Sequence, residues 1–436
     1  MKATPLAPLR MNKGMGLFPR LYYGWRRGMK WLGIFLAVSG PGIIVMLADN
    51  DAGGITTYAA TGARYGYGLL WFLVILGPVA YYVQEMTVRL GAVTKRGHAE
   101  AIFDAFGPFW GWFSLLDLIL TDWLTLITEF IGMTAAMSIF HVPPFVTVIV
   151  VSIVMILMVL QGSYWTWEKI AFFFCILNLV YIPCAILARP SVSDIVRSGI
   201  IPNFPGGFSN QMFFFLMANI GTTIAPWMVF FQQSAVVDKG IQEKDVPWSK
   251  LDTAIGSAFT VLVAGFVIIT TATVLKGAPI DSAAQAAIAL GGVNKWLGTL
   301  LAVGLFDAGF LGAICISLAS SWAFGEVFGW AHSLNNKIRE APWFYAMYII
   351  LLGTAGAVVL IPSAPLVIIT LFVQVIAVTL LPAALVFLIL LLNDGERMGK
   401  FKNSPTQNII SVTVVGLIVI LSTLYGVSAL FPNLFK

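Results

Sequence analysis

Long apolar stretches separated by short polar or basic segments make up most of this sequence. Stretches long enough for a helix to cross a bilayer, about 20 residues, cover residues 31–63, 68–92, 110–139, 144–161, 167–188, 210–237, 252–275, 293–328, 341–361, 365–391 and 408–431. They lack the apolar and polar alternation of transmembrane strands. Because backbone amides in lipid need internal partners, we expect an all-α bundle of eleven membrane-spanning helices.

The composition agrees with a membrane protein. Hydrophobic residues make up 59% of the 436 residues and charged residues 10%, a balance that excludes a typical water-soluble domain. We expect a basic segment over residues 1–30 and one membrane domain over residues 31–436. No short apolar segment with a small-residue cleavage site precedes the first span, so no cleavable signal peptide is expected.

The positive charges predict the orientation in the membrane. The first thirty residues contain no acid, and their basic residues are Lys2, Arg10, Lys13, Arg20, Arg26, Arg27 and Lys30. By the positive-inside rule this segment lies in the cytosol, and eleven spans then place the C-terminus outside. Its position directly before an apolar span favours a topology signal over a nucleic-acid-binding arm. We expect a multi-pass protein of the cell membrane.

Two spans, five apart, contain residues that interrupt a helix. The first holds the string Asp49-Asn50-Asp51-Ala52-Gly53-Gly54, and the sixth holds Gly221-Thr222-Thr223-Ile224-Ala225-Pro226-Trp227. Such a pair of breaks indicates inverted repeats, here spans 1–5 and 6–10, with a substrate site where the breaks meet. Unwound carbonyls and half-helix C-termini attract cations. A simple kink at Pro226 is the structural alternative.

Asp51 is the strongest candidate ligand. An Asp at the bilayer centre costs about 2.5–3.5 kcal/mol on insertion scales, so a bare carboxylate there normally serves an ion or a partner. Other acids within the predicted spans are Asp49, Glu85, Asp117, Asp122, Glu129, Asp307 and Glu326. This acid-rich interior suits a cation pathway, although we expect Asp117, Asp122 and Glu326 to be solvated at helix ends.

Several strings resemble the Nramp family of divalent-metal transporters: Asp51-Ala52-Gly53-Gly54, Gly62-Ala63-Arg64-Tyr65-Gly66-Tyr67, Arg89-Leu90-Gly91 and Gln374-Val375. The resemblance implies a LeuT-like fold, with inverted repeats of spans 1–5 and 6–10 plus one C-terminal helix. It further implies a metal site built from the first and sixth helices, with the metal ion as transported substrate and no cofactor.

The departures from the family pattern concern the metal ligands. The family uses an Asp and an Asn of helix 1 and the Met of a Met-Pro-His string in helix 6, and these match Asp51, Gly54 and Ala225, with Trp227 in place of the His. Without soft sulfur the site favours hard ions, and loss of the Asn side chain is expected to enlarge the cavity for a hydrated ion such as Mg²⁺. The chain thus resembles the Nramp-related magnesium transporters, which implies uptake of magnesium, with manganese as an accompanying substrate.

The resemblance also bears on coupling. Proton-coupled members carry two histidines in helix 6, where this chain has Trp227 and Gln232, and neither side chain titrates near neutral pH. Glu129 matches one member of the family's acidic pair on helix 3, and the other is apolar. We therefore expect uncoupled, potential-driven uptake by alternating access, since 100 mV is worth about 4.6 kcal/mol for a divalent ion.

The expected metal site combines backbone and side-chain oxygens. Its ligands are predicted from Ala48, Asp51, Gly54, Ile224 and Ala225, surrounded by Asp49, Thr222, Thr223, Gln374, Trp227 and Gln232. Asp49 either adds a second negative charge or points to external water. The threonines either face the ion through water or bond back to helix carbonyls, and Trp227 is expected to pack beside the break.

Two other transport functions remain open. One is proton-coupled import of manganese or iron of the usual Nramp kind, against which the missing Met and His argue. The other is sodium-coupled transport of organic solutes on the same fold, although Asp51 would repel a substrate carboxylate. An enzyme is not expected, because the three histidines are scattered and no nucleophile–base pair or phosphate loop appears. No obligatory protein partner and no nucleic acid are expected.

Overall fold

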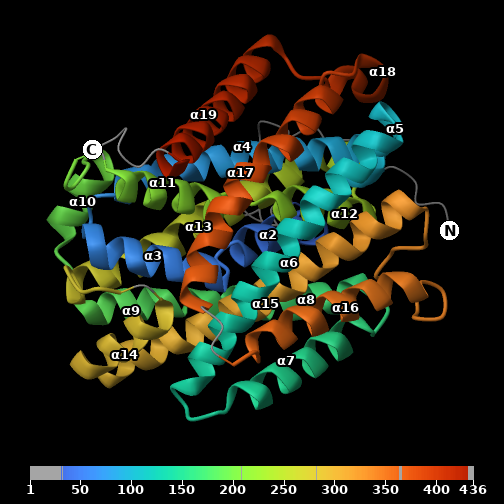
Figure 1. Cartoon of the computed structure of the whole chain (residues 1–436). Helices are drawn as coiled ribbons and strands as arrows, with labels where there is room; N and C mark the ends of the chain where they lie inside the picture. Colours follow the sequence, from blue (N-terminus) through green and yellow to red (C-terminus); the bar gives the residue numbers. More distant parts are fainter. Residues whose placement is uncertain (1–30, 32, 208, 281, 363–365, 431–436) are drawn as a thin grey trace, which may run out of the picture.

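The computed structural model describes residues 31–430 except 32, 208, 281 and 363–365 (Figure 1). The predicted basic segment 1–30 and the last residues, 431–436, lie outside the described residues. Every regular element in the described part is a helix. The helices are α2 (Pro41–Ala48), α3 (Ala52–Tyr65), α4 (Leu70–Thr94), α5 (His98–Phe106), α6 (Pro108–Ser138), α7 (Pro144–Val159), α8 (Tyr164–Leu177), η1 (Asn178–Val180), α9 (Tyr181–Ala188), α10 (Val192–Ile200), α11 (Asn210–Thr223), α12 (Pro226–Asp238), η2 (Glu243–Asp245), α13 (Val246–Val274), α14 (Ala283–Val293), α15 (Lys295–Phe328), α16 (Pro342–Val359), α17 (Leu366–Leu392), α18 (Gly395–Met398), η3 (Gly399–Phe401) and α19 (Pro405–Leu430).

Each predicted span coincides with one of these helices or with a group of consecutive ones. Eight helices or helix groups of the described chain are long and apolar enough to cross a membrane. The all-helical membrane fold is thereby confirmed, and the number of eleven spans stays a prediction.

The two predicted breaks are real interruptions. Residues 49–51 separate α2 from α3, and Ile224 and Ala225 separate α11 from α12. Ala225 adopts an extended conformation (φ −96°, ψ 149°) directly before Pro226, as residues before proline prefer. Pro226 then begins α12, a position where its missing N–H costs no hydrogen bond. A mere kink at Pro226 is therefore excluded, because the helix stops and restarts.

A third interruption was not predicted. The span expected over residues 167–188 consists of α8 and α9 joined by the 3₁₀ turn η1. The hydropathy pattern did not reveal it, but Pro183 of α9 lies four residues after Leu179 and cannot donate to the Leu179 carbonyl, which accounts for the local loss of α-helical bonding.

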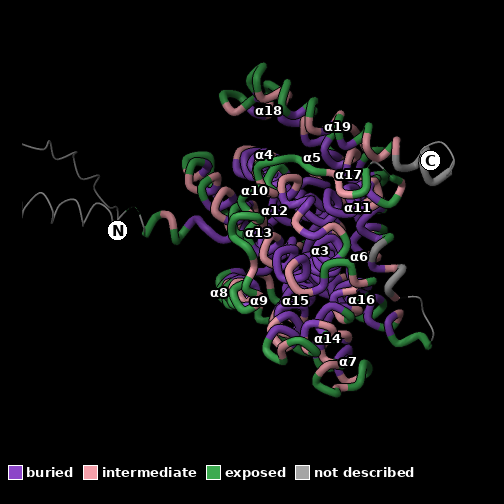
Figure 2. The backbone as a smooth tube through the Cα atoms, turned by 90° about the vertical axis from the view of Figure 1, so that its left-hand side faces the viewer, coloured by how far each residue is buried: buried purple, intermediate pink, exposed green. Residues whose placement is uncertain are grey.

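The broken helices lie in the middle of the bundle. Figure 2 shows α3, α12 and α13 among the buried segments, with α18 and α7 at opposite margins. Helix α13 packs against α2, α3 and α4, while α15 packs against α6 and α3, and α17 packs against α11 and α3. The first break is thus enclosed by helices from both halves of the chain.

Candidate metal site at the helix breaks

Two carboxylates hold the start of α3. Oδ1 of Asp51 accepts a hydrogen bond from the Gly54 amide at 2.6 Å, and Oε2 of Glu129 accepts one from the Ala52 amide at 2.8 Å. In a continuous helix the Ala52 amide would donate to the carbonyl of Ala48. Glu129 diverts this donor, so the expected backbone ligand Ala48 ends α2 without its usual helical partner.

Asp49 lies inside the break and away from solvent. Its side chain is 1% exposed, and neither carboxyl oxygen has a hydrogen-bond partner among the described residues. It sits at the C-cap of α2, where the helix dipole is negative, and it lies close enough to Asp51 for their charges to interact. Of the two predicted orientations, the one toward external water is excluded.

Two threonines, Thr222 and Thr223, end α11 at the second break, and their hydroxyl groups have different surroundings. The Thr223 hydroxyl donates to the Asn219 carbonyl at 2.7 Å and lies 2.9 Å from the Tyr58 hydroxyl of α3. Asn219 also donates to Thr61 of α3 at 2.9 Å. Thr223 therefore bonds back to its own helix, as the structural alternative predicted, and helps to join α11 to α3.

Thr222 instead faces the turn that Asp51 caps. A Cβ added to Gly54 would lie 2.5 Å from the Thr222 hydroxyl and 3.2 Å from Oδ1 of Asp51. The predicted enlargement of the cavity at Gly54 is therefore wrong for this structure, because Thr222 fills the space where a side chain would begin. Gly54 allows the close approach of α11 and donates its amide to Asp51.

Gln374 and Trp227 both lie beside the breaks. A side chain on Gly53 would collide with the Gln374 amide, and one on Gly221 would collide with the Gln374 carbonyl, so α17 packs against both broken helices at this residue. Gln374 is buried, and its amide nitrogen finds no acceptor within the described part of the chain. Trp227 is buried with its ring centroid 6.0 Å from that of Phe231, which is the packing role predicted for it.

Gln232 does not lie at the helix breaks but between α12 and its neighbouring helices. It donates to the Thr253 hydroxyl at 2.8 Å and accepts from the Thr87 hydroxyl at 3.2 Å, which ties α12 to α13 and α4. Seven residues after Ala225, it is roughly 10 Å along the helix from the break. Its predicted place around the metal is therefore wrong, and it serves helix packing.

Reasoning from the sequence missed the residues that shape the break from outside. Glu129 was noted as an acid but not as the acceptor for Ala52. Asn50 donates to the Thr260 carbonyl at 3.3 Å, and the Thr260 hydroxyl bonds to the Met46 carbonyl, so α13 supports both sides of the interruption. The polar character of these positions was a signal, but their partners are 77 to 214 residues away.

The donors at the break suit a hard cation. In the described chain no three His, Cys, Asp or Glu side chains form a metal-binding cluster. The carboxylates of Asp49 and Asp51 and the backbone carbonyls at the breaks are oxygen ligands of the kind that Mg²⁺ and Mn²⁺ accept. The Met228 sulfur at the second break accepts a hydrogen bond from the Ala225 amide at 3.3 Å.

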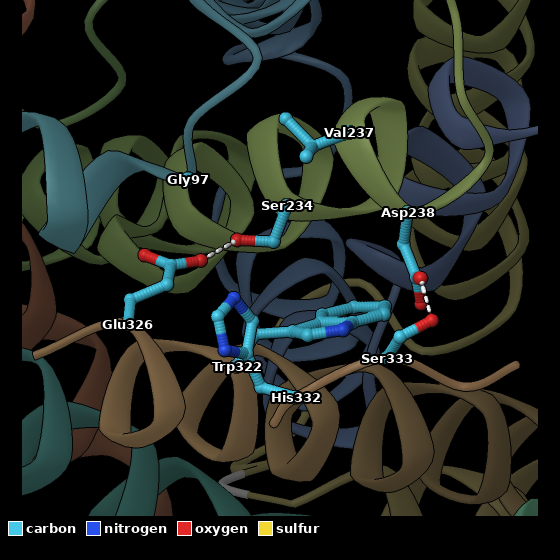
Figure 3. Close-up of a pocket in the computed structure, with 8 residues that line it drawn as sticks. All are labelled: Gly97, Ser234, Val237, Asp238, Trp322, Glu326, His332 and Ser333. Atoms are coloured by element: carbon cyan, nitrogen blue, oxygen red, sulfur yellow. Dashed lines mark hydrogen bonds between the residues drawn. The ribbon is translucent and has the colours of Figure 1, made fainter. Parts of the chain in front are cut away.

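Two cavities lie at other places in the bundle. One, of about 250 Å³, runs beside α3 and α6; its lining is mostly apolar and includes Thr56, Thr134 and Thr370. The other, of about 160 Å³, lies at the end of α12 (Figure 3). Its Glu326 accepts from Ser234 at 2.6 Å and its Asp238 accepts from the Leu334 amide at 2.8 Å.

Two acids expected at the solvated surface are buried instead. Glu326 is 7% exposed and accepts backbone amides at the start of α5. Asp122 is 0% exposed and accepts from Ser320 at 2.6 Å. Asp117 is partly exposed, but it lies nine residues after the start of α6 and not at a helix end.

Comparisons with known proteins agree with the geometry. The model of the family described as natural resistance-associated macrophage protein-like, or Nramp, matches residues 42–428. The divalent metal cation transporter MntH of Caldanaerobacter subterraneus subsp. tengcongensis is 25% identical over 92% of this chain and 96% of its own length. MntH of Bradyrhizobium diazoefficiens is 23% identical over 91% of this chain and 89% of its own.

Two solved structures share the fold. The manganese transporter of Eremococcus coleocola, in complex with an aromatic bis-isothiourea substituted compound, has a TM-score of 0.75 at 21% identity and covers 92% of this chain and 89% of its own. MhsT in complex with L-phenylalanine has a TM-score of 0.63 at 13% identity, and the match covers 91% of this chain and 98% of MhsT. The predicted LeuT-like architecture is confirmed at this level.

Proposed function

This chain belongs to the Nramp family and is a multi-pass membrane transporter of divalent metal ions, and we propose that its preferred substrate is magnesium, with manganese carried as well. The proposed transport is uncoupled from protons and driven by the membrane potential. The N-terminus is proposed to face the cytosol and the C-terminus the outside.

The observation that carries this proposal is the pair of buried carboxylates at the first break. Asp49 has no hydrogen-bond donor in the described structure, and Asp51 uses one oxygen to cap α3. At the second break Ile224 and Ala225 offer backbone carbonyls and no imidazole, and the sulfur of Met228 is engaged by a hydrogen bond from the Ala225 amide at 3.3 Å. A site of carboxylates and carbonyls lacks the soft ligands that favour transition metals and therefore suits a hard ion.

Magnesium requires a site that leaves part of its water shell in place. In this structure Thr222 fills the space beside Gly54, so a hydrated ion requires α11 to move away from α3. The rocking of two broken helices in alternating access provides such a movement.

Uncoupled transport is supported by the sixth span. Trp227 packs in the core and Gln232 is held by Thr253 and Thr87, so neither provides a titratable group where proton-coupled relatives carry histidine. The membrane potential alone supplies about 4.6 kcal/mol per divalent ion at 100 mV, enough for roughly thousandfold accumulation.

Metal flux into proteoliposomes tests the proposal. Wild-type protein is expected to admit Mg²⁺ under an inward-negative potential without acidifying the lumen, and Asp51→Ala is expected to admit none above background. Asp117→Asn, which changes a partly exposed Asp on α6, is the matched control and should transport normally. Reproducible lumenal acidification coupled to Mg²⁺ or Mn²⁺ entry would instead establish the proton-coupled alternative.

A further inference from the structure

The turn η1 and helix α15 bring together three buried polar side chains away from the helix breaks. Asn178 begins η1, Tyr181 begins α9, and Asp307 lies on α15, which packs against both. A 3₁₀ turn within a helix marks either a functional hinge or a sequence under strain, and Pro183 is a local source of strain here, so the case for a site depends on the side chains themselves. An ionisable residue at this depth is by default a candidate for function.

All three side chains are fully buried and unsatisfied. Asp307, Asn178 and Tyr181 are each 0% exposed. Both carboxyl oxygens of Asp307, both amide atoms of Asn178 and the Tyr181 hydroxyl have no hydrogen-bond partner in the part of the chain that is described. Buried polar groups in native proteins nearly always have a partner, so three unsatisfied groups at one place point to a bound ligand.

The three groups lie close to one another. The Asn178 amide lies beside the Asp307 carboxyl, but in an arrangement that satisfies neither group. Tyr181 is near enough to interact with the Asp307 charge, and its ring packs against Gly304 one turn earlier on α15. The ion pairs of the described residues leave Asp307 out.

This cluster is separate from the site at Asp51. Gly304 and Asp307 are three residues apart and therefore share one face of α15, which is turned toward α9. Side chains added to Gly309 and Gly312 would instead meet Glu129 and the Asp51 turn. The two sites thus lie on different faces of the same helix.

We propose that Asp307, Asn178 and Tyr181 form a binding site for a hard monovalent cation, with sodium as the representative ion. One carboxylate and two neutral oxygen donors balance a single positive charge, whereas a divalent ion would leave a net charge in a low-dielectric interior. A proton on Asp307 is the competing occupant, because a protonated carboxyl could exchange hydrogen bonds with the neighbouring Asn178 amide, and the test below separates it from sodium. A transition metal is disfavoured, because no three typical metal-binding side chains converge in the described structure. The inference is independent of the proposed choice of magnesium.

Thermal unfolding of the full-length protein in detergent tests this site. Sodium chloride is titrated against choline chloride at constant ionic strength and pH, without divalent metal. Wild type is expected to show a saturable rise of Tm with sodium, and Asp307→Asn is expected to lose it. Tyr181→Phe keeps the ring against Gly304, and should weaken the apparent sodium affinity at least tenfold. Asp51→Asn should retain the full shift.

Three outcomes would overturn the proposal. The first is an equal Tm of wild type in sodium and choline, and the second is a sodium shift that survives in Asp307→Asn. The third is a Tm that depends on pH but not on sodium and loses this dependence in Asp307→Asn, which would assign the site to a proton. Should Asp307→Asn fail to fold, Tyr181→Phe carries the test, and an unchanged sodium affinity in that variant contradicts the proposal.

Discussion

The two ends of the short helix α2 differ in whether the buried charged side chains beside them have partners. At its N-terminal end, Asp252 of α13 accepts hydrogen bonds from the amides of Gly40 at 3.1 Å and Gly42 at 2.7 Å. Beside it, Lys239 pairs with Glu168 at 2.7 Å, and both side chains are nearly fully buried. Lys239 also donates to the carbonyl of Ser39 at 2.6 Å.

At the C-terminal end, eight residues later, Asp49 is equally buried but has no donor among the described residues. The same half-helix therefore begins in a clamp of satisfied charges, formed by Asp252, Lys239 and Glu168, and ends in an unsatisfied carboxylate. Satisfied charges hold this conformation together, whereas the carboxyl of Asp49 remains available for the proposed metal ion. In the proposed orientation the clamp lies on the cytosolic side of α2.

Removing one member of the clamp is expected to have the largest effect. Lys239→Met leaves Glu168 buried without its counter-ion, which should lower the free energy of unfolding by about 3–5 kcal/mol. Denaturant unfolding of the detergent-purified protein measures this loss. The double variant Lys239→Met with Glu168→Gln should recover most of the stability, and a single variant as stable as wild type would contradict the clamp.

Asp51→Asn tests the other end of α2 without removing its cap. Asn is as good an N-cap as Asp, so the hydrogen bond from the Gly54 amide and the thermal stability should be retained. Mg²⁺ influx should fall about 100-fold, or about 2.7 kcal/mol, because the charge is lost. Influx is measured with a magnesium-sensitive dye in proteoliposomes, and near-normal influx would exclude Asp51 as the ligand.

Asp49→Asn should raise the half-saturating Mg²⁺ concentration about tenfold, which corresponds to a loss of about 1.4 kcal/mol in binding free energy. Stability should not decrease, since the carboxylate has no hydrogen bond to lose. The comparison variant is Asp252→Asn at the clamp, for which the opposite result is expected: a lower Tm and an unchanged half-saturating concentration in the folded protein. Equal behaviour of the two variants would remove the distinction between the ends of α2.

Thr223→Val should have the smallest effect. It removes the hydroxyl that bonds to Asn219 and Tyr58, at a cost of about 1 kcal/mol in unfolding free energy. The half-saturating Mg²⁺ concentration should stay the same, because this hydroxyl is used for packing. Thr223→Ser keeps the hydroxyl and should resemble wild type, so a large change of metal affinity in Thr223→Val would place Thr223 at the ion.

Much of the candidate site was recognisable from local sequence, but its neighbours were not. Asp51 and Pro226 could be recognised because their effects do not depend on the rest of the fold. A carboxylate within the membrane is costly in any helix, and proline always lacks the N–H that a helix interior needs. The role of Gly54 was misjudged, since a missing side chain leaves a cavity only if no neighbour fills it, and Thr222 of α11 does. Gln232 was placed around the metal by its position in a motif, whereas its partners Thr87 and Thr253 hold it elsewhere.

The sequence by itself determined that this is a helical membrane protein broken at two places, because helix length, hydropathy and the geometry of proline are local properties. Only the tertiary structure decided which charges are satisfied. Glu129 reaches Ala52 across 77 residues, and Asp252 reaches Gly42 across 210. Asp307, by contrast, lies beside Asn178 and Tyr181 and takes part in none of the ion pairs formed by the described residues. Whether a buried acid supports the fold or binds an ion depends on such distant partners, which no local pattern specifies.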